Sequence, residues 1–198
     1  MDSVERHIGN NLRTFIAVKV IPDEKAAASL KDIRTTLQTE NILWNKTENF
    51  HITLLFIGST PIDMLYPIQE SMDFVASQTH PFDFFISGIG VFRTINHPRV
   101  LWLGVNESKA LKDLKELTDK SLFPLLKMEA REQFKPHLTI GRMRRINDLK
   151  NLEALLRNYK TRDFLKVKVQ EIIFYESITT SGGPVYRSIS NHTLKKDS

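Results

Sequence analysis

The 198-residue sequence predicts a single α+β domain built from two similar halves. Three observations lead to this class. The composition is typical of globular proteins, with 41% hydrophobic and 26% charged residues. Short β-branched runs alternate with amphipathic stretches, and a His-x-Thr pattern occurs in two of the strand-like runs. The length is close to the roughly 150 residues of one domain and no Ser/Gly/Pro-rich linker divides the chain, which favours one domain over residues 1–198.

The first part of the chain predicts a strand, a helix, two further strands and a second helix. Residues 13–20 (RTFIAVKV) are β-branched, and residues 22–24 (PDE) suit the first turn of a helix. Leu30, Ile33 and Leu37 give this helix an apolar stripe that ends before Asn41. The remaining elements are expected at 42–46 and 50–57 for the strands and at 61–78 for the helix.

The second part predicts a hairpin, two helices and three more strands. The hairpin joins 82–92 to 99–105 through a turn at 96–98. Asn106 is expected to cap a helix with Leu111, Leu114 and Leu117 on one face, which ends near Phe123 and Pro124. The other elements are expected as a strand at 136–143, a helix at 147–159, and long strands at 164–175 and 184–194 joined by Ser181-Gly182-Gly183.

Composition also restricts the function. Without cysteine the chain has no disulfide framework, thiol nucleophile or zinc-thiolate site, so its chemistry must use His, Ser/Thr and charged residues. The first dozen residues contain no apolar signal region, and no run approaches the ~20 apolar residues of a membrane span, so we expect a cytoplasmic protein away from membranes. A net charge of +5 and a pI of about 9.4 suit a polyanionic partner.

Two segments of similar sequence carry the pattern His-x-Thr. One begins at His51 and the other at His137, and both lie in apolar, strand-like runs. Because alternate side chains of a strand share a face, Thr53 should point to the side of His51, and Thr139 to the side of His137. An imidazole and a hydroxyl about 7 Å apart can contact one small anion, so each segment predicts half of an anion site.

The apolar residues of the first segment are expected on the opposite face of the strand. They are Phe50, Ile52, Leu54 and Phe56. His and Thr are also common on solvated sheet faces. The pattern alone therefore leaves a second interpretation open, in which the histidines and threonines of the two segments are ordinary half-exposed residues without a function.

A basic cluster accompanies the second segment. Arg142, Arg144, Arg145 and Lys135 form either a solvated face or, beside His137, a funnel for phosphate. Other residues are left out of the predicted site: Phe92, Trp102 and Phe134 are interpreted as core, and His7, His80, His97 and His192 lack the motif.

A wider set of motifs points to a family. They are Thr14-Phe15-Ile16-Ala17, WNKTENFHITLLFIG at 44–58, Gly88-x-Gly90-x-Phe92, PRVLWLG at 98–104, KPHLTIGR at 135–142, Tyr175-Glu176-Ser177 and Gly183-Pro184-Val185-Tyr186. With these motifs the chain resembles the RNA 2′,3′-cyclic phosphodiesterases, once called 2′-5′ RNA ligases, of the two-histidine phosphoesterase superfamily. The resemblance implies a bilobal α+β fold in which two antiparallel sheets face each other across a central cleft, with helices outside and one His-x-Thr in each sheet.

The resemblance also implies a chemistry for the site. His51 would be the general acid and His137 the general base, Thr53 and Thr139 would donate to phosphate oxygens, and Arg142 would clamp the same oxygens. No metal or other cofactor is expected. The expected substrates are 2′,3′-cyclic phosphate ends of RNA or small nucleotides, opened to 2′-phosphates by a monomeric enzyme. Two alternatives stay open: cleavage or formation of 2′-5′ linkages, and an RNA-end binding module without catalysis.

Overall fold

A computed structural model of the chain describes residues 10–129, 133–180 and 183–195. It has four α-helices and nine strands within these ranges, plus two short 3₁₀ turns at Thr47–Asn49 and Ile62–Met64. The helices are α1 (Glu24–Thr36), α2 (Leu65–Gln78), α3 (Lys109–Leu126) and α4 (Leu149–Tyr159). The strands are β1 (Asn11–Lys19), β2 (Asn41–Trp44), β3 (His51–Pro61), β4 (Phe82–Thr94), β5 (His97–Val105), β6 (His137–Arg145), β7 (Asp163–Val169), β8 (Glu171–Thr180) and β9 (Gly183–Thr193).

The strands form one strongly curled antiparallel sheet in the order β7-β4-β5-β6-β3-β1-β8-β9, with β2 paired to β6. Its two halves meet at β3 and β6, which are paired at one position only, Ile52 with Leu138. We call β1, β3, β8 and β9 the β3 half, and β2, β4, β5, β6 and β7 the β6 half. The predicted α+β class with two antiparallel layers is confirmed, and the two layers are continuous through this one pair.

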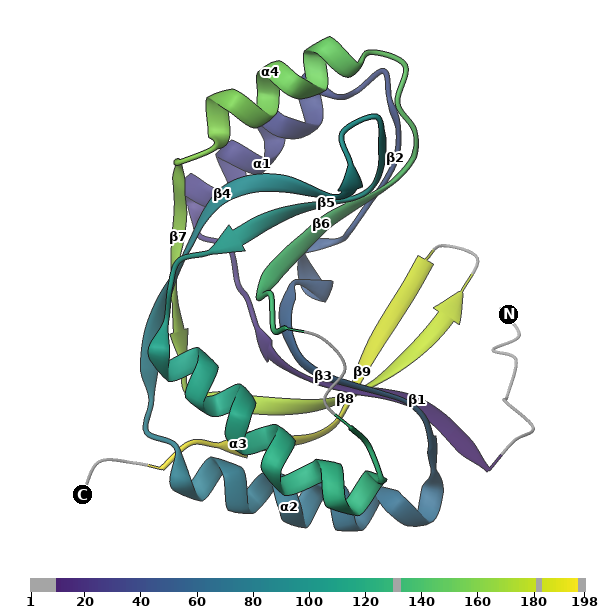
Figure 1. The fold of residues 1–198 in the computed structure, drawn as a ribbon, viewed down its shortest axis with the longest axis vertical. Coiled ribbons are helices and arrows are strands. Elements are labelled where there is room, and N and C mark those ends of the chain that lie inside the picture. The colour runs from purple at the N-terminus through teal and green to yellow at the C-terminus, as the bar shows by residue number, and fades with distance from the viewer. Residues whose placement is uncertain (1–9, 130–132, 181–182, 196–198) are drawn as a thin grey trace.

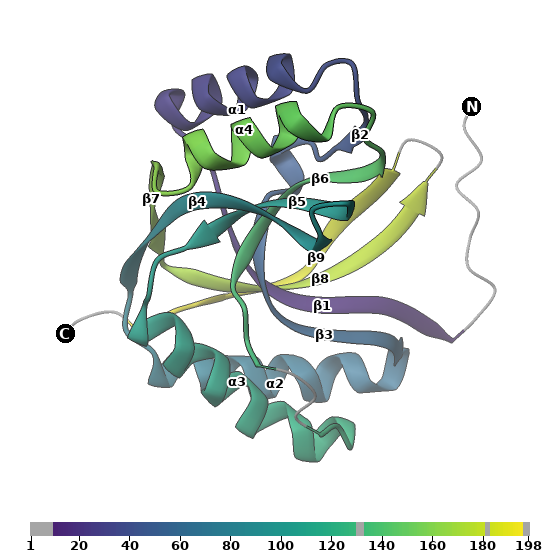
Figure 2. The same cartoon turned by 45° about the horizontal axis from the view of Figure 1, so that its top comes forward.

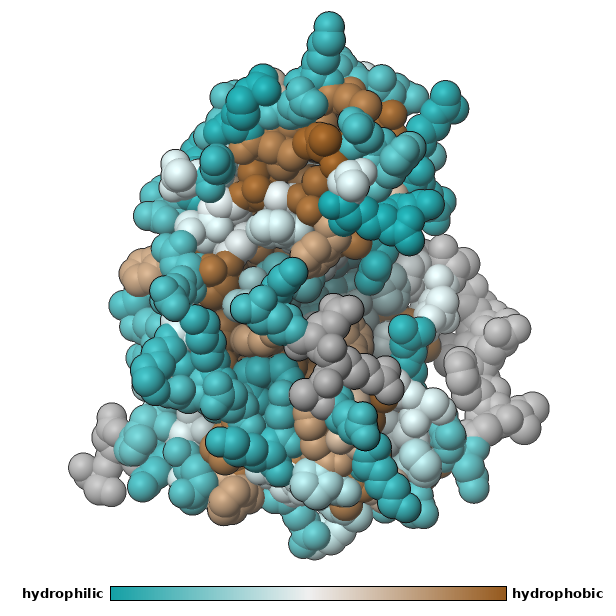
Figure 3. Space-filling view, in the orientation of Figure 1, coloured by the Kyte–Doolittle hydropathy of each residue, from teal (hydrophilic) through white to brown (hydrophobic). Residues whose placement is uncertain are grey.

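Helices cover the sheet from two ends of the molecule (Figures 1 and 2). α2 and α3 pack together and contact β3, β8 and β9, whereas α1 and α4 lie side by side and contact β7 and β4. Hydrophilic residues dominate the outer surfaces of α2 and α3 in Figure 3, and the largest hydrophobic area of that view lies below α4. None of the helices in the described ranges combines the length and the apolar character needed to cross a membrane.

Helix ends follow from local capping. The Asp23 carboxylate accepts the Ala26 N–H at 2.7 Å at the start of α1, and Ser108 accepts the Leu111 N–H at 3.3 Å at the start of α3. The predicted cap at Asn106 is therefore wrong: α3 begins at Lys109, and the Asn106 side-chain oxygen instead accepts a hydrogen bond from the Ser87 hydroxyl on β4. α3 continues past Pro124 to Leu126 and ends where Lys127 takes a left-handed conformation, with φ of 51°.

The expected strand at 164–175 is two strands. β7 ends at Val169 on the edge of the β6 half, where it pairs with β4, and β8 starts at Glu171 and pairs with β1 in the β3 half. Gln170 lies between them, and its carbonyl accepts the Leu194 N–H at 2.9 Å. β8 and β9 pair up to Thr180 and Gly183, while Ser181 and Gly182 of the expected turn lie outside the described residues.

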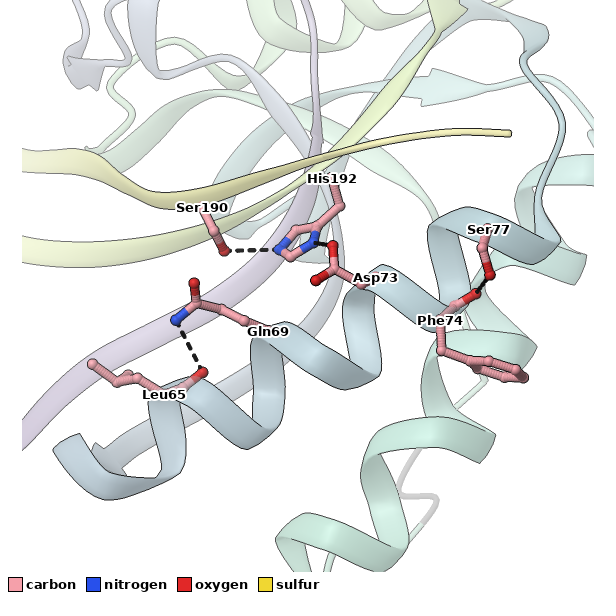
Figure 4. A network of polar contacts seen from close by, with 7 residues as sticks. All are labelled: Leu65, Gln69, Asp73, Phe74, Ser77, Ser190 and His192. Atoms are coloured by element: carbon pink, nitrogen blue, oxygen red, sulfur yellow. Dashed lines mark hydrogen bonds and ion pairs between the residues drawn. The ribbon is translucent and has the colours of Figure 1, made fainter. Parts of the chain in front are cut away.

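A buried histidine joins α2 to the sheet (Figure 4). The His192 side chain on β9 is 3% exposed, and its Nδ1 lies 2.6 Å from the Asp73 carboxylate on α2. Its Nε2 lies 2.8 Å from the Ser190 hydroxyl. Since a carboxylate only accepts, Nδ1 donates to Asp73, and the Ser190 hydroxyl is the partner of Nε2. Both ring nitrogens are bonded, which lets a polar side chain lie buried beneath the helix.

Candidate active site

A bulge in β3 decides which side chains face the site. The register with β1 pairs Ile16 with Leu55 and Ala17 with Thr53, so Leu54 is an extra residue on β3. Such a bulge interrupts the strict alternation of a strand and redirects the side chains that follow. As a result Phe56, three residues after Thr53, is 59% exposed. The prediction that Phe56 lies on the face opposite His51 and Thr53, with Phe50 and Ile52, is wrong for this physical reason.

β6 has a bulge at the equivalent place. Its register with β5 pairs Leu101 with Gly141 and Trp102 with Thr139, which leaves Ile140 as the extra residue. Leu138, Ile140 and Met143 are buried, while Arg142 is exposed. Without the bulge, an odd separation of five residues would place Arg142 on the face opposite His137. With it, Arg142 returns to the side of His137 and Thr139.

The backbone fixes the two histidines in the same way. His51 Nδ1 lies 2.7 Å from the carbonyl of Asn49, and His137 Nδ1 lies 2.8 Å from the carbonyl of Lys135, in each case two residues earlier. A carbonyl oxygen only accepts, so both rings carry a proton on Nδ1. Nε2 remains available for a substrate, as an acceptor when the ring is neutral and as a donor when it is charged.

Aromatic rings enclose His51. The ring of Phe15 lies 4.9 Å from the imidazole, Tyr186 approaches edge-on at 5.1 Å, and Tyr175 lies at 6.4 Å, all between centroids. Burial lowers the pKa of His51 to about 4, against the opposing effect of the Asn49 carbonyl, and the charges of His137 and Arg142 lower it further. The pKa of His51 on β3 is thus affected by charged groups of β6 as well as by its own segment.

His137 has more open surroundings. Phe92 lies edge-on at 4.6 Å between centroids. Burial lowers the pKa of His137 as well, opposed by the hydrogen bond to the Lys135 carbonyl. Both imidazoles are therefore biased towards the neutral form in the free protein, and the bias is stronger for the more deeply enclosed His51.

Two cavities share Phe56. His137 lines one of them, His51 lines neither, and Tyr186, which contacts His51, lines the other. The apolar cavity, of about 630 Å³, is lined by Thr53, His137 and several aromatic rings, among them Phe92 and Phe134. The arginine cavity, of about 580 Å³, is lined by Arg13, Arg142, Arg144, Tyr186 and hydroxyl side chains of β8. Of the predicted site residues, Thr53 and His137 thus meet at one cavity and Arg142 lines the other.

Thr139 and the rest of the basic cluster occupy different places. Thr139 is half-buried, shares the strand face of His137 by alternation, and is not on the walls of these two cavities. Lys135 lines the apolar cavity and Arg144 the arginine cavity, whereas Arg145 lines neither. Within the described ranges, no three His, Asp or Glu side chains converge so as to hold a metal ion.

Sequence reasoning missed the aromatic side chains of the site. Phe15 lies on β1, and Tyr175 and Tyr186 lie on the paired strands β8 and β9. All three belong to motifs of the family resemblance, but no local pattern marks them as neighbours of His51. Phe92 and Phe134 line the apolar cavity rather than only the core. Trp102 does have a packing role, because a Cβ added to Gly90 would lie 2.3 Å from its ring.

Comparisons with known proteins agree with this architecture. The family model of LigT-like phosphoesterases matches residues 20–102. An RNA 2′,3′-cyclic phosphodiesterase of Archaeoglobus fulgidus is 32% identical over 179 residues, which cover 90% of this chain and 98% of that protein. Among solved structures, a Thermus thermophilus protein aligns with a TM-score of 0.78 at 22% identity, covering 94% of this chain and 100% of that one. E. coli LigT complexed with 3′-AMP aligns with a TM-score of 0.67 at 17% identity, covering 95% of this chain and all of LigT. On the strength of the Archaeoglobus relative, the chain belongs to the RNA 2′,3′-cyclic phosphodiesterase family of LigT-like phosphoesterases.

Proposed function

We propose that the protein hydrolyses 2′,3′-cyclic phosphate ends of RNA or small nucleotides to 2′-phosphates, without a metal ion. The observation that carries this proposal is the pair of histidines from opposite halves, each held with Nδ1 protonated and Nε2 free, beside Arg142. The names of the relatives support the substrate class, and 3′-AMP bound to E. coli LigT supports a nucleotide phosphate ligand.

The reaction needs one base and one acid on opposite sides of phosphorus. His137 Nε2 takes a proton from water, and the water oxygen forms a bond to phosphorus. The P–O3′ bond breaks, and His51 Nε2 gives its proton to the departing O3′. The product carries a 2′-phosphate and a free 3′-hydroxyl. Thr53 and Thr139 donate to the non-bridging oxygens, where charge redistributes in the transition state.

This division of roles requires that His51 becomes protonated when the substrate binds. In the free protein its pKa is about 4, so the ring is neutral near pH 7 and cannot act as an acid. A bound phosphodiester places a negative charge beside the ring and offsets the positive charge of Arg142, and both effects favour the imidazolium. Binding of the substrate should therefore be accompanied by proton uptake at His51.

The arginine cavity supports a polyanionic substrate. Arg13, Arg142 and Arg144 line it together, and none of them forms an ion pair with a carboxylate in the described part of the chain. Unpaired arginines beside a phosphate site provide charge for the backbone of a nucleic acid. The charges of Arg13 and Arg142 also act on Tyr186 and oppose the rise in its pKa that burial causes, so both guanidinium groups lie near the His51 enclosure.

The test is hydrolysis of adenosine 2′,3′-cyclic phosphate in excess EDTA, with the product identified by chromatography against adenosine 2′- and 3′-phosphate. We expect the 2′-phosphate and a bell-shaped pH profile, because one ring must be neutral and the other charged. His51→Ala and His137→Ala should each lose about 10²–10⁴-fold in rate. His97→Ala, at an exposed histidine of the β4–β5 turn, is the matched control and should keep the wild-type rate.

Two results would contradict the proposal. An absolute requirement for an added divalent metal would exclude the metal-free mechanism. Binding without any turnover would instead favour the module that recognises RNA ends.

A further inference from the structure

The arginine cavity is formed by strands of both halves of the sheet. Arg142 and Arg144 come from β6, Arg13 from β1, and Ser177 and Thr179 from β8. None of the residues that line it is acidic. Three guanidinium groups and several hydroxyl groups, with no carboxylate among them, make a cavity that favours anionic ligands.

A neighbouring arginine of β9 differs from the arginines of the cavity. Arg187 donates from Nε to the Glu176 carboxylate of β8 at 2.9 Å, and it is not on the cavity wall. Arg13, Arg142 and Arg144 are exposed and have no such carboxylate partner within the described ranges. Their charges are therefore available to a ligand.

Arg142 and Arg144 follow one another along β6. The side chain of Met143 between them is buried, so the two arginines leave the strand on its other side and reach the same cavity. Residues two positions apart in a strand are separated by about 7 Å. The phosphorus of a 2′,3′-cyclic phosphate and a phosphorus on O5′ of the same ribose are a similar distance apart. The spacing of the two arginines therefore suits two successive phosphates.

The two arginines of β6 lie at different distances from the histidines. Arg142 acts on the pKa of His51 and on that of Tyr186, which places its charge beside the proposed reaction site. Arg144 is two residues further from His137 along β6. Arg13 approaches the cavity from β1 and also acts on the pKa of Tyr186. Arg13 and Arg144 thus line the part of the wall that the reacting phosphate leaves free.

We propose that Arg13 and Arg144 form a second phosphate subsite, which binds the phosphate on O5′ of the nucleotide that carries the 2′,3′-cyclic phosphate. The inference rests on the proposed function, in which Arg142 clamps the reacting phosphate. It specifies a substrate with a phosphate on both sides of the terminal ribose, and a cyclic phosphate of a bare nucleoside would fill only half of the site. Ser177 and Thr179 supply further hydrogen-bond donors to the same phosphate.

The experiment compares two ligands that differ only in the second phosphate. Adenosine 2′-phosphate and adenosine 2′,5′-bisphosphate are titrated by calorimetry against the full chain. We expect the wild type to bind the bisphosphate more tightly. Arg13→Gln and Arg144→Gln should each weaken the bisphosphate by about 10-fold, the effect of losing one charge-assisted hydrogen bond. The loss for adenosine 2′-phosphate should be much smaller, so the ratio of the two affinities should fall towards one.

Arg145→Gln is the matched control, because Arg145 is exposed on the same strand and lines neither cavity. It removes the same charge and should keep the wild-type ratio. A wild-type ratio in Arg13→Gln and Arg144→Gln would overturn the subsite. An equal fall of the ratio in Arg145→Gln would also overturn it, because the effect would then be one of net charge.

A third ligand distinguishes the two sources of a phosphate on O5′. An adenosine dinucleotide with a 2′-phosphate on its last ribose carries a diester at this position, as an RNA end does. A loss of its affinity in Arg144→Gln assigns the subsite to RNA ends, and a loss confined to the bisphosphate assigns it to free nucleotides. None of these ligands contains a cyclic phosphate, so the titrations give their answer even if the protein proves not to hydrolyse one.

Discussion

His51 and His137 share a tautomer but have different surroundings. Three aromatic rings enclose His51, and burial holds its pKa at about 4. His137 contacts one ring, Phe92, and stands on the wall of an open cavity. Two groups of the same chemical type thus have surroundings that favour the neutral form to different degrees.

The enclosure of His51 also links stability to pH. The unfolded imidazole has a pKa near 6.5 and the folded one about 4, so between these values the unfolded chain binds more protons. The free energy of unfolding should therefore fall as the pH is lowered through that window. We expect His51→Gln to remove up to about 3 kcal/mol of this dependence. Urea unfolding of both proteins at pH 7 and pH 4.5 measures it, and an identical pH dependence in the variant would contradict the enclosure.

The acid and base roles are separable by the choice of leaving group. A nitrophenyl phosphodiester releases an oxygen that needs no proton, so the acid becomes dispensable while the base is still required. We expect this substrate to restore most of the rate lost in His51→Ala and little of that lost in His137→Ala. Relative rates on the nitrophenyl and nucleoside substrates give the answer. Equal restoration in both variants would reject the assignment, and restoration in His137→Ala alone would reverse it.

At the scale of elements, the bulges at Leu54 and Ile140 separate what could be predicted from what could not. Alternation within a strand correctly predicts buried Ile52 and Leu138, since it depends on neighbours in sequence. The positions of Phe56 and Arg142 depend on the register of β3 with β1 and of β6 with β5. That register is a property of distant pairs, so the local sequence does not contain it.

Other misplaced boundaries have the same origin. Asn106 is a good capping residue by type, but its side-chain oxygen accepts from the Ser87 hydroxyl, and Ser108 caps the helix instead. The run at 164–175 is continuously strand-like in sequence. Only its two different partners, β4 and β1, divide it at Gln170.

Gly141 gives the β6 bulge a direct test. A Cβ at this position would lie 2.8 Å from Ile42 Cγ2 and 3.1 Å from the Trp44 ring, so these side chains of β2 would have to shift. We expect Gly141→Ala to cost about 1–3 kcal/mol of stability, as overpacking usually does. Since Arg142 is the next residue, KM for the cyclic phosphate should rise more than kcat falls. Urea unfolding and steady-state kinetics measure the two effects, and a variant with wild-type stability and KM would refute this account of the bulge.

At the scale of the whole molecule, the chain passes repeatedly between the halves. The chain starts with β1 in the β3 half and then forms α1 and β2 on the β6 half. It goes back to the β3 half to form β3 and α2. β4 and β5 lie in the β6 half, α3 covers the β3 half, and β6, α4 and β7 precede the final return to β8 and β9. Neither half is a continuous stretch of sequence, so neither can complete its sheet alone.

This interleaving predicts cooperative unfolding. Leu138, 1% exposed, pairs with Ile52 where the halves meet. We expect Leu138→Ala to cost about 2–5 kcal/mol, the usual cost of such a truncation in a core. The variant should still unfold in one transition, with far-ultraviolet circular dichroism and tryptophan fluorescence coinciding. Two separated transitions would show that the halves are independent folding units.

The carbonyl groups that orient the histidines belong to the main chain, at Asn49 and Lys135. Every amino acid carries the same carbonyl, so substitution at either position leaves this orienting contact intact as long as the backbone keeps its path. Part of the proposed active site is therefore invisible to any comparison of side chains, and substitutions at these two positions can preserve the same proton arrangement. A designer who transfers the two histidines to another scaffold must copy the preceding backbone conformation as well.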